Sequence, residues 1–348
     1  MKNIVKKYGD FLASDHVSLG VEKGKLVALL GPSGSGKTTL LRMIAGLENP
    51  NEGDIYIDGK RVNDVPAAKR GIGFVFQNYA LFRYMTVYDN VAFGLVLQKM
   101  PKKQIKERVT ELLAMTGLSG MEKRYPNQLS GGQRQRVAFA RALAPNPRVL
   151  LLDEPFAAID AKVRTELRSW LKEMVVKLGI TSIFVTHDQE EAMSISDMIV
   201  VMKDGVVQQI GKPQDVYDSP VNLFVAKFLG TPPINVFEGQ IRGGSLYIGE
   251  NAVLLTPGIS DQPVSVGIRP EGFIPDKKGA LCCQLGGMEV MGRDISVVST
   301  HASSVNPVIR SIISSDIQIR LDAKTIRFSI KPNKIFLFRH DNGERINL

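Results

Sequence analysis

Two short segments of this 348-residue chain carry residue types that could bind a nucleotide and hydrolyse its phosphate anhydride. The first is the glycine-rich run Gly31–Thr38 (GPSGSGKT), which follows an apolar segment and precedes a helical pattern. Glycines let backbone N–H groups turn inward around phosphate oxygens, and a helix N-terminus adds its partial positive charge. In this context the motif predicts that Lys37 contacts the β- and γ-phosphates and that Thr38 ligates Mg²⁺.

The second segment is Val149–Glu154 (VLLLDE), in which four apolar residues predict a buried strand that ends in two carboxylates. Asp153 is placed to hold the coordination sphere of Mg²⁺, and Glu154 to polarise an attacking water as a general base. An Asp-Glu pair after a strand is usually only a solvated strand end. The glycine-rich run upstream favours the functional interpretation here.

The elements that must position these residues alternate between apolar strands and helical patterns as far as about residue 230, which predicts an α/β layered domain. The expected strands are Leu26–Leu30, Ile72–Phe76, Val149–Asp153, Ser182–Thr186 and Met198–Met202. The expected helices include Lys37–Ala45, Lys103–Met115, Gln133–Ala144 and Ala161–Leu178. The long helical stretch between the second and third strands indicates a helical subdomain, at about residues 80–145, inserted into the α/β core.

The pattern changes after Thr231-Pro232-Pro233, where short alternating segments are separated by Gly, Pro and Asn turns. The expected strands of this part are Ser245–Ile248, Val264–Ile268, Ile295–Ser299, Ile317–Leu321, Thr325–Ile330 and Lys334–Phe338. Short strands without a long helix predict a small all-β barrel. We therefore expect two domains, residues 1–230 and 231–348.

Composition excludes several classes of protein. No apolar run approaches the roughly 18 to 20 residues that span a bilayer, and the N-terminus lacks a signal-peptide pattern, so we expect a cytoplasmic location. The net charge of +9 is dispersed along the chain. As binding partners, it favours an anionic nucleotide and the inner membrane surface over DNA. Adjacent Cys282 and Cys283 cannot form a disulfide framework, and the histidines have no Cys or His at metal-ligand spacing.

The segment Leu129–Gln133 (LSGGQ), just ahead of a helix, narrows the choice of family because it resembles the signature sequence of ATP-binding-cassette (ABC) ATPases. In that family the signature faces the γ-phosphate bound by the opposite subunit. The resemblance thus implies a head-to-tail homodimer, or a paired ATPase, with two ATP molecules between the protomers. It implies an ATP-binding set made of Tyr8, Gly31, Pro32, Ser33, Gly34, Ser35, Gly36, Lys37, Thr38, Thr39, Ser130, Gly131, Gly132, Gln133 and Asp160.

The same resemblance implies particular roles. Tyr8 matches the aromatic residue that stacks on adenine, and Asp160 matches the loop that crosses the dimer interface. The implied catalytic residues are Glu154, His187 and Gln77, and the implied Mg²⁺ set is Thr38, Gln77 and Asp153. Family members usually carry a few residues before the equivalent of Lys2–Val5, so we expect a short or frayed first strand.

The branch of the family is indicated by several further segments. Asn78–Val87, Thr186–Ala192 and Tyr217–Pro220 resemble importer ATPases, and Gly267–Glu271 (GIRPE) resembles the accessory barrel of maltose-, polyol-, sulfate- and polyamine-type importers. The implied fold is an α/β P-loop ABC ATPase domain with an inserted helical subdomain, followed by a small all-β, OB-like (TOBE) barrel. The implied partners are two integral membrane permease subunits that contact Gln77–Thr86 and, indirectly, an extracytoplasmic solute-binding protein. The chain would act at the cytoplasmic face of the membrane.

The substrate is harder to infer, because such an ATPase does not touch it. Pro220–Ala226 and Pro232–Asn235 favour a sugar or polyol, which we place first. Leu81–Met85 and Arg168–Leu171 favour sulfate or another oxyanion instead, and a polyamine is a further alternative. The barrel is either a dimerisation module or a regulatory one.

Rival classes with the same signature are DNA-repair or chromosome ATPases, ribosome-associated factors and non-transport ATPases that bind nucleic acid. The first are interrupted by long coiled coils, and nothing heptad-like separates Gln77 from Leu129. The second normally fuse two cassettes. The near-neutral charge of the barrel argues against the third, so we expect no nucleic-acid partner.

Overall fold

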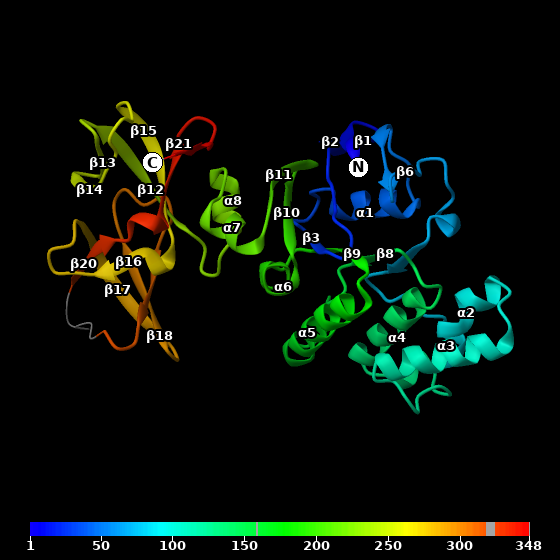
Figure 1. The fold of residues 1–348 in the computed structure, drawn as a ribbon. Helices are drawn as coiled ribbons and strands as arrows, with labels where there is room; N and C mark the ends of the chain where they lie inside the picture. The colour runs from blue at the N-terminus through cyan, green and yellow to red at the C-terminus, as the bar shows by residue number, and fades with distance from the viewer. Residues whose placement is uncertain (158, 318–323, 348) are drawn as a thin grey trace. The chain divides into compact units, whose positions relative to one another are not determined.

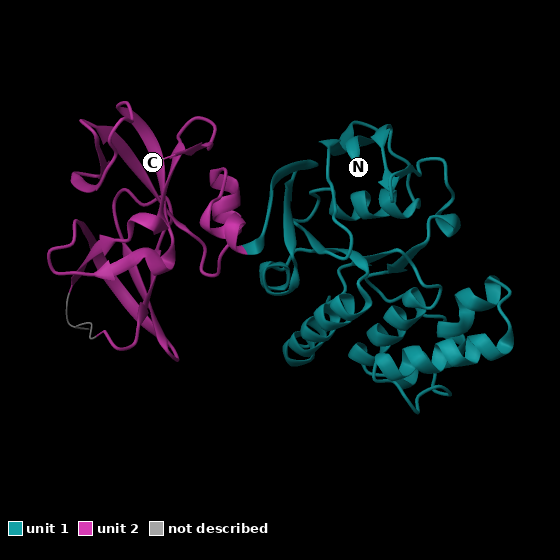
Figure 2. Cartoon of the chain, viewed as in Figure 1, with its two compact units in different colours: residues 1–213 teal, residues 214–348 magenta. Residues whose placement is uncertain are grey.

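The computed structural model describes residues 1–157, 159–317 and 324–347. The described chain divides into two compact units, Met1–Pro213 and Gln214–Leu348 (Figure 2). This division falls earlier than the domain boundary expected at residue 230. None of the described helices combines the length and the apolar character that crossing a bilayer requires.

The first unit is built on a six-stranded sheet with the order β11-β10-β3-β9-β8-β7 (Figure 1). The strands β10, β3, β9, β8 and β7 run parallel, and β11 pairs antiparallel at one edge. The strands of this unit are β1 (Lys2–Tyr8), β2 (Phe11–Val17), β3 (Leu26–Leu30), β4 (Glu52–Asp54), β5 (Tyr56–Ile57), β6 (Lys60–Arg61), β7 (Ile72–Val75), β8 (Val149–Asp153), β9 (Thr181–Thr186), β10 (Met198–Lys203) and β11 (Val206–Gly211).

Helices connect the parallel strands, as the alternating pattern predicts. They are α1 (Lys37–Ala45), α2 (Val87–Leu97), α3 (Lys102–Met115), α4 (Gly131–Leu143), α5 (Ala161–Leu178) and α6 (Gln189–Ile195). Figure 1 shows α2, α3 and α4 packed together, and all three lie in the sequence between β7 and β8, where a helical insertion was expected. The expected elements of this unit match the observed ones to within one or two residues at each end.

The interior of the first unit explains why its central strands are so apolar. All five residues of β3 are buried, and β8 and β9 are buried along most of their length. A parallel sheet covered on both faces requires such continuous apolar strands. Residues of α1, including Leu40, Leu41 and Ile44, pack into the same core.

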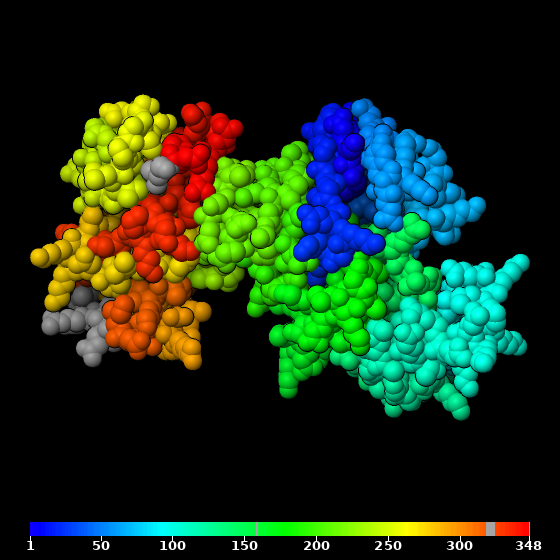
Figure 3. All heavy atoms as spheres, in the orientation of Figure 1, coloured from blue at the N-terminus to red at the C-terminus, as the bar shows by residue number. Residues whose placement is uncertain are grey.

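A second, antiparallel sheet with the order β2-β1-β4 completes this unit, together with the β5–β6 hairpin. The space-filling view shows β1 and β2, in dark blue, beside the light-blue segment that carries β4 to β6 (Figure 3). The expectation of a short or frayed first strand is wrong. β1 has seven residues and pairs on both sides, with β2 and with β4.

The second unit contains two antiparallel sheets, with the orders β14-β13-β12-β15-β21-β22 and β16-β20-β17-β18-β19. Its strands are β12 (Asn235–Arg242), β13 (Ser245–Ile248), β14 (Asn251–Leu255), β15 (Gln262–Ile268), β16 (Phe273–Pro275), β17 (Leu281–Met291), β18 (Asp294–Thr300), β19 (Ile309–Ser314), β20 (Thr325–Ile330), β21 (Ile335–Arg339) and β22 (Arg345–Ile346). The strand expected at Ile317–Leu321 lies, apart from Ile317, outside the described residues. Cys282 and Cys283 of β17 are free thiols, and burial raises the pKa of Cys283 to about 11.

Two short helices, α7 (Pro213–Asp218) and α8 (Leu223–Phe228), join this unit rather than the first. One residue that holds them there is Arg269, which is completely buried after β15. Its guanidinium donates hydrogen bonds to the carbonyls of Tyr217, Ala226 and Leu229, and it stacks 3.9 Å from the centre of the Tyr217 ring. The sequence boundary at residue 230 therefore separates segments that this side chain holds together.

Candidate active site

The candidate site lies at the carboxyl edge of the parallel sheet of the first unit. The strands β3, β9, β8 and β7 are consecutive neighbours, and residues at or next to their ends are paired in register: Leu30 with Thr186, Val185 with Asp153, and Leu152 with Val75. Parallel strands that end together place the segments after them at one edge of the sheet. The sequence motifs that follow these four strands thus converge, although they lie far apart along the chain.

The segment Gly31–Thr38 leads from β3 into the first turn of α1 and has a backbone that favours glycine at two positions. Gly34 has φ 82° and Gly36, the N-cap of α1, has φ 89°. A Cβ atom on Gly36 would lie 2.1 Å from the Ala13 carbonyl oxygen, and one on Gly31 would lie 2.3 Å from that of Met202. The close approach of neighbouring backbone therefore fixes these glycines. Pro32, Ser33 and Ser35 complete the loop, and Thr39 lies in the first turn of α1.

Lys37 is buried at the start of α1, with its ammonium group turned back on the loop. Its Nζ donates to the carbonyl oxygens of Gly31 and Pro32, both at 2.8 Å, and to Ser35 Oγ at 3.1 Å. Burial lowers the pKa of Lys37, whereas the nearby charges of Glu154 and Asp153 raise it. These oxygens hold the ammonium group in place, and its positive charge at the N-terminus of α1 favours an anion.

Thr38 and Asp153 bring a hydroxyl and a carboxylate together. Thr38 Oγ1 donates to Asp153 Oδ1 at 2.9 Å. Burial raises the pKa of Asp153, the hydrogen bond from Thr38 lowers it, and the charge of Glu154 raises it further. Two carboxylates beside a hydroxyl form an oxygen-rich site that suits Mg²⁺, a cation that usually keeps only one or two protein ligands and completes its shell with phosphate and water.

Glu154, directly after β8, has φ 43° and so occupies the left-handed region that non-glycine residues rarely adopt. Its backbone N–H donates to the Val185 carbonyl at 3.1 Å, which holds the strained residue against β9. Its two carboxylate oxygens have different partners. Gln77 Nε2 donates to Oε2 at 2.7 Å, and His187 Nδ1 lies 3.2 Å from Oε1. Strain of this kind often accompanies a functional position.

The signature segment forms the start of α4. Ser130 is the N-cap: its Oγ accepts from the Gln133 backbone at 3.3 Å, and its backbone N–H donates to Gln133 Oε1 at 2.9 Å. Gly131 and Gly132 form the first turn, and a Cβ on Gly132 would lie 3.0 Å from Val163. Within the described residues, no hydrogen bond or ion pair joins this segment to the Gly31–Thr38 loop. The two segments thus make no polar contact with each other in the described part of one chain.

The remaining expected residues lie apart from the carboxylate cluster. Asp160 caps α5 and accepts from the Val163 backbone at 3.0 Å. Ala158, in the same loop, is outside the described residues. Tyr8 ends β1 with 45% of its surface exposed, and Lys6 Nζ lies 4.9 Å from the centre of its ring.

Two residues that hold the segment around Gln77 in place were missed by sequence reasoning. Asn90 of α2 and Arg141 of α4 hydrogen-bond to backbone groups of residues 79–86. The available signal was weak. Asn90 is a polar residue directly before the largely apolar stretch Val91–Leu97, and Arg141 resembles any helix-surface arginine.

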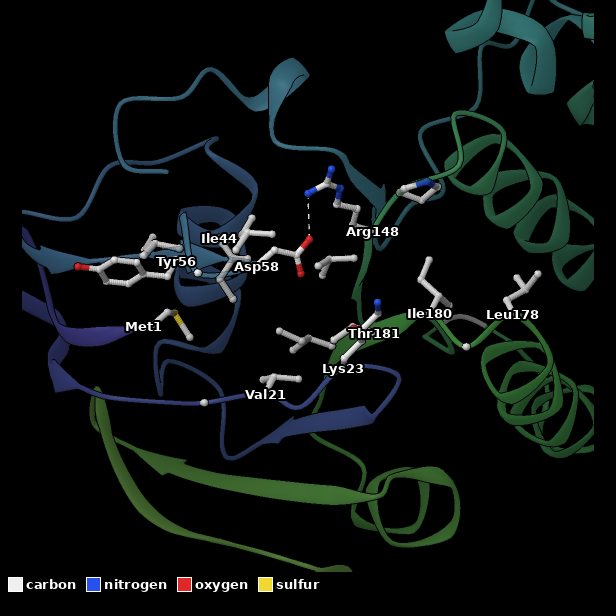
Figure 4. Close-up of a pocket in the computed structure, with 18 of the residues that line it drawn as sticks. Met1, Val21, Lys23, Ile44, Tyr56, Asp58, Arg148, Leu178, Ile180 and Thr181 are labelled. Atoms are coloured by element: carbon white, nitrogen blue, oxygen red, sulfur yellow. Dashed lines mark hydrogen bonds and ion pairs between the residues drawn. The ribbon is translucent and has the colours of Figure 1, made fainter. Parts of the chain in front are cut away.

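A separate cavity of about 790 Å³ lies at the opposite, amino edge of the sheet (Figure 4). It is lined by residues that include Val149 and Thr181, which begin β8 and β9, and by Met1 and Tyr56. An ion pair between Arg148 and Asp58, 2.9 Å long, crosses this region. None of the expected site residues lines this cavity.

The parallel sheet, the glycine-rich loop before α1 and the carboxylates after β8 together define a P-loop ATPase. Residues 14–157 match the ABC transporter family. The sulfate/thiosulfate import ATP-binding protein CysA of Mycobacterium tuberculosis H37Rv is 60% identical over 264 residues, which is 76% of this chain and 75% of CysA. CysA of Mycolicibacterium paratuberculosis is 57% identical over 317 residues, 91% of this chain and 84% of the relative.

Solved structures agree with the relatives. The ATP-binding cassette MJ0796, in a dimeric post-hydrolysis state bound to ADP and Pi, has 38% identity and a TM-score of 0.55 over 61% of this chain and 97% of its own. The Clostridium perfringens cbiO1 protein, part of the ABC transporter complex cbiONQ, has 34% identity and a TM-score of 0.58 over 63% of this chain and 89% of its own. The chain therefore belongs to the ATP-binding subunits of ABC importers, and it is an ATPase.

Proposed function

We propose that this chain powers the import of an oxyanion, sulfate or thiosulfate. The observation that carries the proposal is the set of curated relatives, which are 52 to 60% identical over about three quarters or more of their length and are named for sulfate/thiosulfate import. These relatives favour an oxyanion as the transported substrate over the sugar or polyol that was expected first. The segments Leu81–Met85 and Arg168–Leu171 had pointed in the same direction.

We infer that ATP binds with its phosphates in the Gly31–Thr38 loop, where Lys37 and the N-terminus of α1 neutralise their charge. Thr38, Asp153 and Gln77 would hold Mg²⁺, which would neutralise the negative charge that develops on the phosphates. Glu154 would take the proton from the attacking water as general base. His187 and Gln77, one on each carboxylate oxygen, orient Glu154 for this step.

The second nucleotide contact would come from another protomer. The signature segment Ser130–Gln133 lies apart from the phosphate loop of its own chain, yet its helix N-terminus is a ready anion site. A head-to-tail homodimer, or a pair with a second ATPase, would close each phosphate loop against the opposite signature, with Asp160 at the interface and Tyr8 stacked on adenine. The dimeric cassette among the solved relatives supports this arrangement.

The permease subunits would dock on the segment Gln77–Thr86. Tyr84 in this segment is 96% exposed, and a hollow of about 830 Å³ beside it is lined by residues that include Arg83, Tyr125 and Arg134. The chain would thus work at the cytoplasmic face of the membrane, and a solute-binding protein would deliver the oxyanion from the other side. We propose that the second unit is the OB-like (TOBE) accessory domain, with a dimerising or regulatory role.

The substrate can be tested by complementation. The chain would be expressed in two bacterial strains, one lacking its sulfate/thiosulfate import ATPase and one lacking its maltose import ATPase. We expect growth on sulfate as the only sulfur source, and uptake of radiolabelled sulfate, in the first strain alone. Glu154→Gln, expressed at the same level, should restore neither.

Each other outcome separates the alternatives. Rescue of the maltose strain alone would overturn the oxyanion proposal in favour of the sugar. If neither strain is rescued while a purified complex from native membranes contains ribosomes or nucleic acid and no permease, the transport assignment itself fails.

A further inference from the structure

The segment of residues 76–86, between β7 and α2, contains an unusual piece of backbone. Tyr79 has φ 63° and the next residue, Ala80, has φ 46°, so two consecutive non-glycine residues occupy the left-handed region. Each such residue costs free energy and persists only where its surroundings enforce it. The groups that enforce this shape therefore control where Gln77, two residues earlier, can lie.

The guanidinium of Arg141, on the far part of α4, holds both of these residues by their carbonyl groups. Arg141 Nη2 donates to the Tyr79 carbonyl at 2.8 Å and Nη1 donates to the Ala80 carbonyl at 2.7 Å. The same guanidinium lies 5.5 Å from the centre of the Phe82 ring. Burial lowers the pKa of Arg141, but an arginine remains charged at neutral pH, so both hydrogen bonds are charge-assisted and strong.

The other end of the segment is held by a different helix. Asn90 of α2 is fully buried, and its side chain bonds the N–H and carbonyl of Phe82 and the carbonyls of Met85 and Thr86. The two helices thus divide the segment between them. Asn90 fixes the part that leads into its own helix, whereas Arg141 joins the part nearest Gln77 to α4.

The helix that carries Arg141 also carries the signature, because Ser130 is its N-cap. A regular helix transmits displacement along its axis, since its backbone hydrogen bonds keep its residues in fixed relation. We propose that Arg141 is a positioning residue that locks the Gln77 segment to the signature helix, so that Gln77 and Ser130 move as one body. The inference rests on the proposed function, which gives Gln77 and Ser130 their parts in ATP hydrolysis.

The test compares Arg141→Gln and Arg141→Lys with the matched control Arg108→Gln in the full-length chain. Arg108, on α3, also donates to a backbone carbonyl of α4, that of Leu143 at 3.2 Å, but it does not touch residues 76–86. The measurements are kcat and KM for MgATP, and hydrogen–deuterium exchange of peptides covering residues 31–38, 76–86 and 129–135 with and without ATP.

We expect Arg141→Gln to lower kcat about 10-fold while KM stays within about 2-fold, because it misplaces Gln77 without removing a phosphate contact. Hydrogen–deuterium exchange should be faster than in the wild type in residues 76–86. ATP should still slow exchange in residues 31–38, but it should no longer slow exchange in residues 129–135. Arg141→Lys, which offers a point charge in place of the planar fork, should recover only part of kcat. Arg108→Gln should behave as the wild type.

A wild-type kcat in Arg141→Gln, or ATP protection of residues 129–135 that survives the change, would overturn the inference. So would an equal loss in Arg108→Gln, since the effect would then be general loosening of the helices. If Arg141→Gln does not fold, Arg141→Lys is compared with the wild type and with Arg108→Gln instead, and the same criteria decide whether the inference holds. None of these measurements involves the transported solute. A failed sulfate complementation would therefore not change what they say about Arg141.

Discussion

The side-chain amide of Gln77 donates a hydrogen bond to Glu154 Oε2 across 2.7 Å, so that residues following two neighbouring strands, β7 and β8, meet directly. The second oxygen of Glu154 faces His187, which follows the third strand, β9. A carboxylate held from both sides has its lone pairs aimed before substrate arrives. Preorganisation of this kind is the largest contribution that proteins make to phosphoryl transfer.

Replacing Glu154 by Gln should abolish turnover while leaving ATP binding intact. The amide keeps the size of the side chain but cannot accept the proton of the attacking water, so we expect kcat to fall at least about 100-fold. ATP affinity should change by less than about 3-fold, because Glu154 is not one of the phosphate-binding residues, and the closed dimer should accumulate with ATP. Single-turnover hydrolysis, equilibrium binding and size-exclusion chromatography measure the three quantities.

Glu173→Gln is the control for this change, since it makes the same substitution at an exposed position of α5. It should hydrolyse ATP as the wild type does. Ready hydrolysis by Glu154→Gln would remove Glu154 from its assigned role.

Asp153→Asn should separate stability from metal-dependent activity. Burial and the neighbouring Glu154 raise the pKa of Asp153 above its ordinary value of 3.8, so the folded protein binds this proton more tightly than the unfolded chain does. The contribution of Asp153 to the free energy of unfolding is therefore greatest when the pH is below 3.8. This contribution is lost as the pH rises through the raised pKa that Asp153 has in the folded protein.

Asparagine carries no ionisable group, so the variant does not suffer this loss of stability. Its amide oxygen still accepts the hydrogen bond from Thr38. Without nucleotide, the variant should therefore melt a few degrees higher than the wild type at pH 7.5. Near pH 3.5 the two should converge. Its hydrolysis should fall about 100-fold or more and respond little to added Mg²⁺. Thermal melts across pH and Mg²⁺ titrations measure this, with Asp10→Asn, in an exposed turn, as the control. A lower melting temperature at pH 7.5 would contradict the argument.

Sequence reasoning succeeded where a feature depends on neighbours along the chain. The observed bounds of α1 and α5 match the predicted ones, and caps mark these ends in the structure: Gly36 and Gly46 for α1, Asp160 and Gly179 for α5. The places of the glycine-rich loop before α1 and of the two carboxylates at the end of β8 were predicted because their residues are contiguous.

It failed where a side chain serves backbone groups far away in the sequence. Arg141 bonds carbonyls 61 and 62 residues earlier, and Arg269 bonds carbonyls 40 to 52 residues earlier. Such contacts leave no periodicity, spacing or motif, because any carbonyl can accept them. The compact units divide after residue 213 rather than at residue 230, and only the folded chain shows that Arg269 binds the helices before residue 230.

Arg269→Gln should destabilise the second unit selectively. The change leaves buried carbonyls of Tyr217, Ala226 and Leu229 without their shared donor and removes the stack on the Tyr217 ring. A buried carbonyl that loses its donor costs about 1 to 3 kcal/mol. We expect a new calorimetric transition at lower temperature and early proteolytic cleavage after residue 213, with ATP binding by the first unit preserved.

The matched control is Arg242→Gln, because Arg242 also stacks on a tyrosine, 4.1 Å from the centre of the Tyr247 ring, but is exposed. It should shift neither the transition nor the cleavage pattern. If Arg269→Gln melts as the wild type does, the helices α7 and α8 are held by other contacts.

Gln135→Met should stabilise the first unit. Gln135 lies in α4, is fully buried, and neither atom of its amide has a hydrogen-bond partner among the described residues. An unpaired buried amide costs about 1 to 3 kcal/mol, whereas methionine fills nearly the same volume without a polar group. Urea unfolding should therefore show a gain of about 1 kcal/mol or more, while Gln104→Met, at an exposed position of α3, should stay within about 0.5 kcal/mol of the wild type. A loss of stability in Gln135→Met would mean that the amide is paired in solution, through a water or a shifted neighbour, and that α4 depends on that contact.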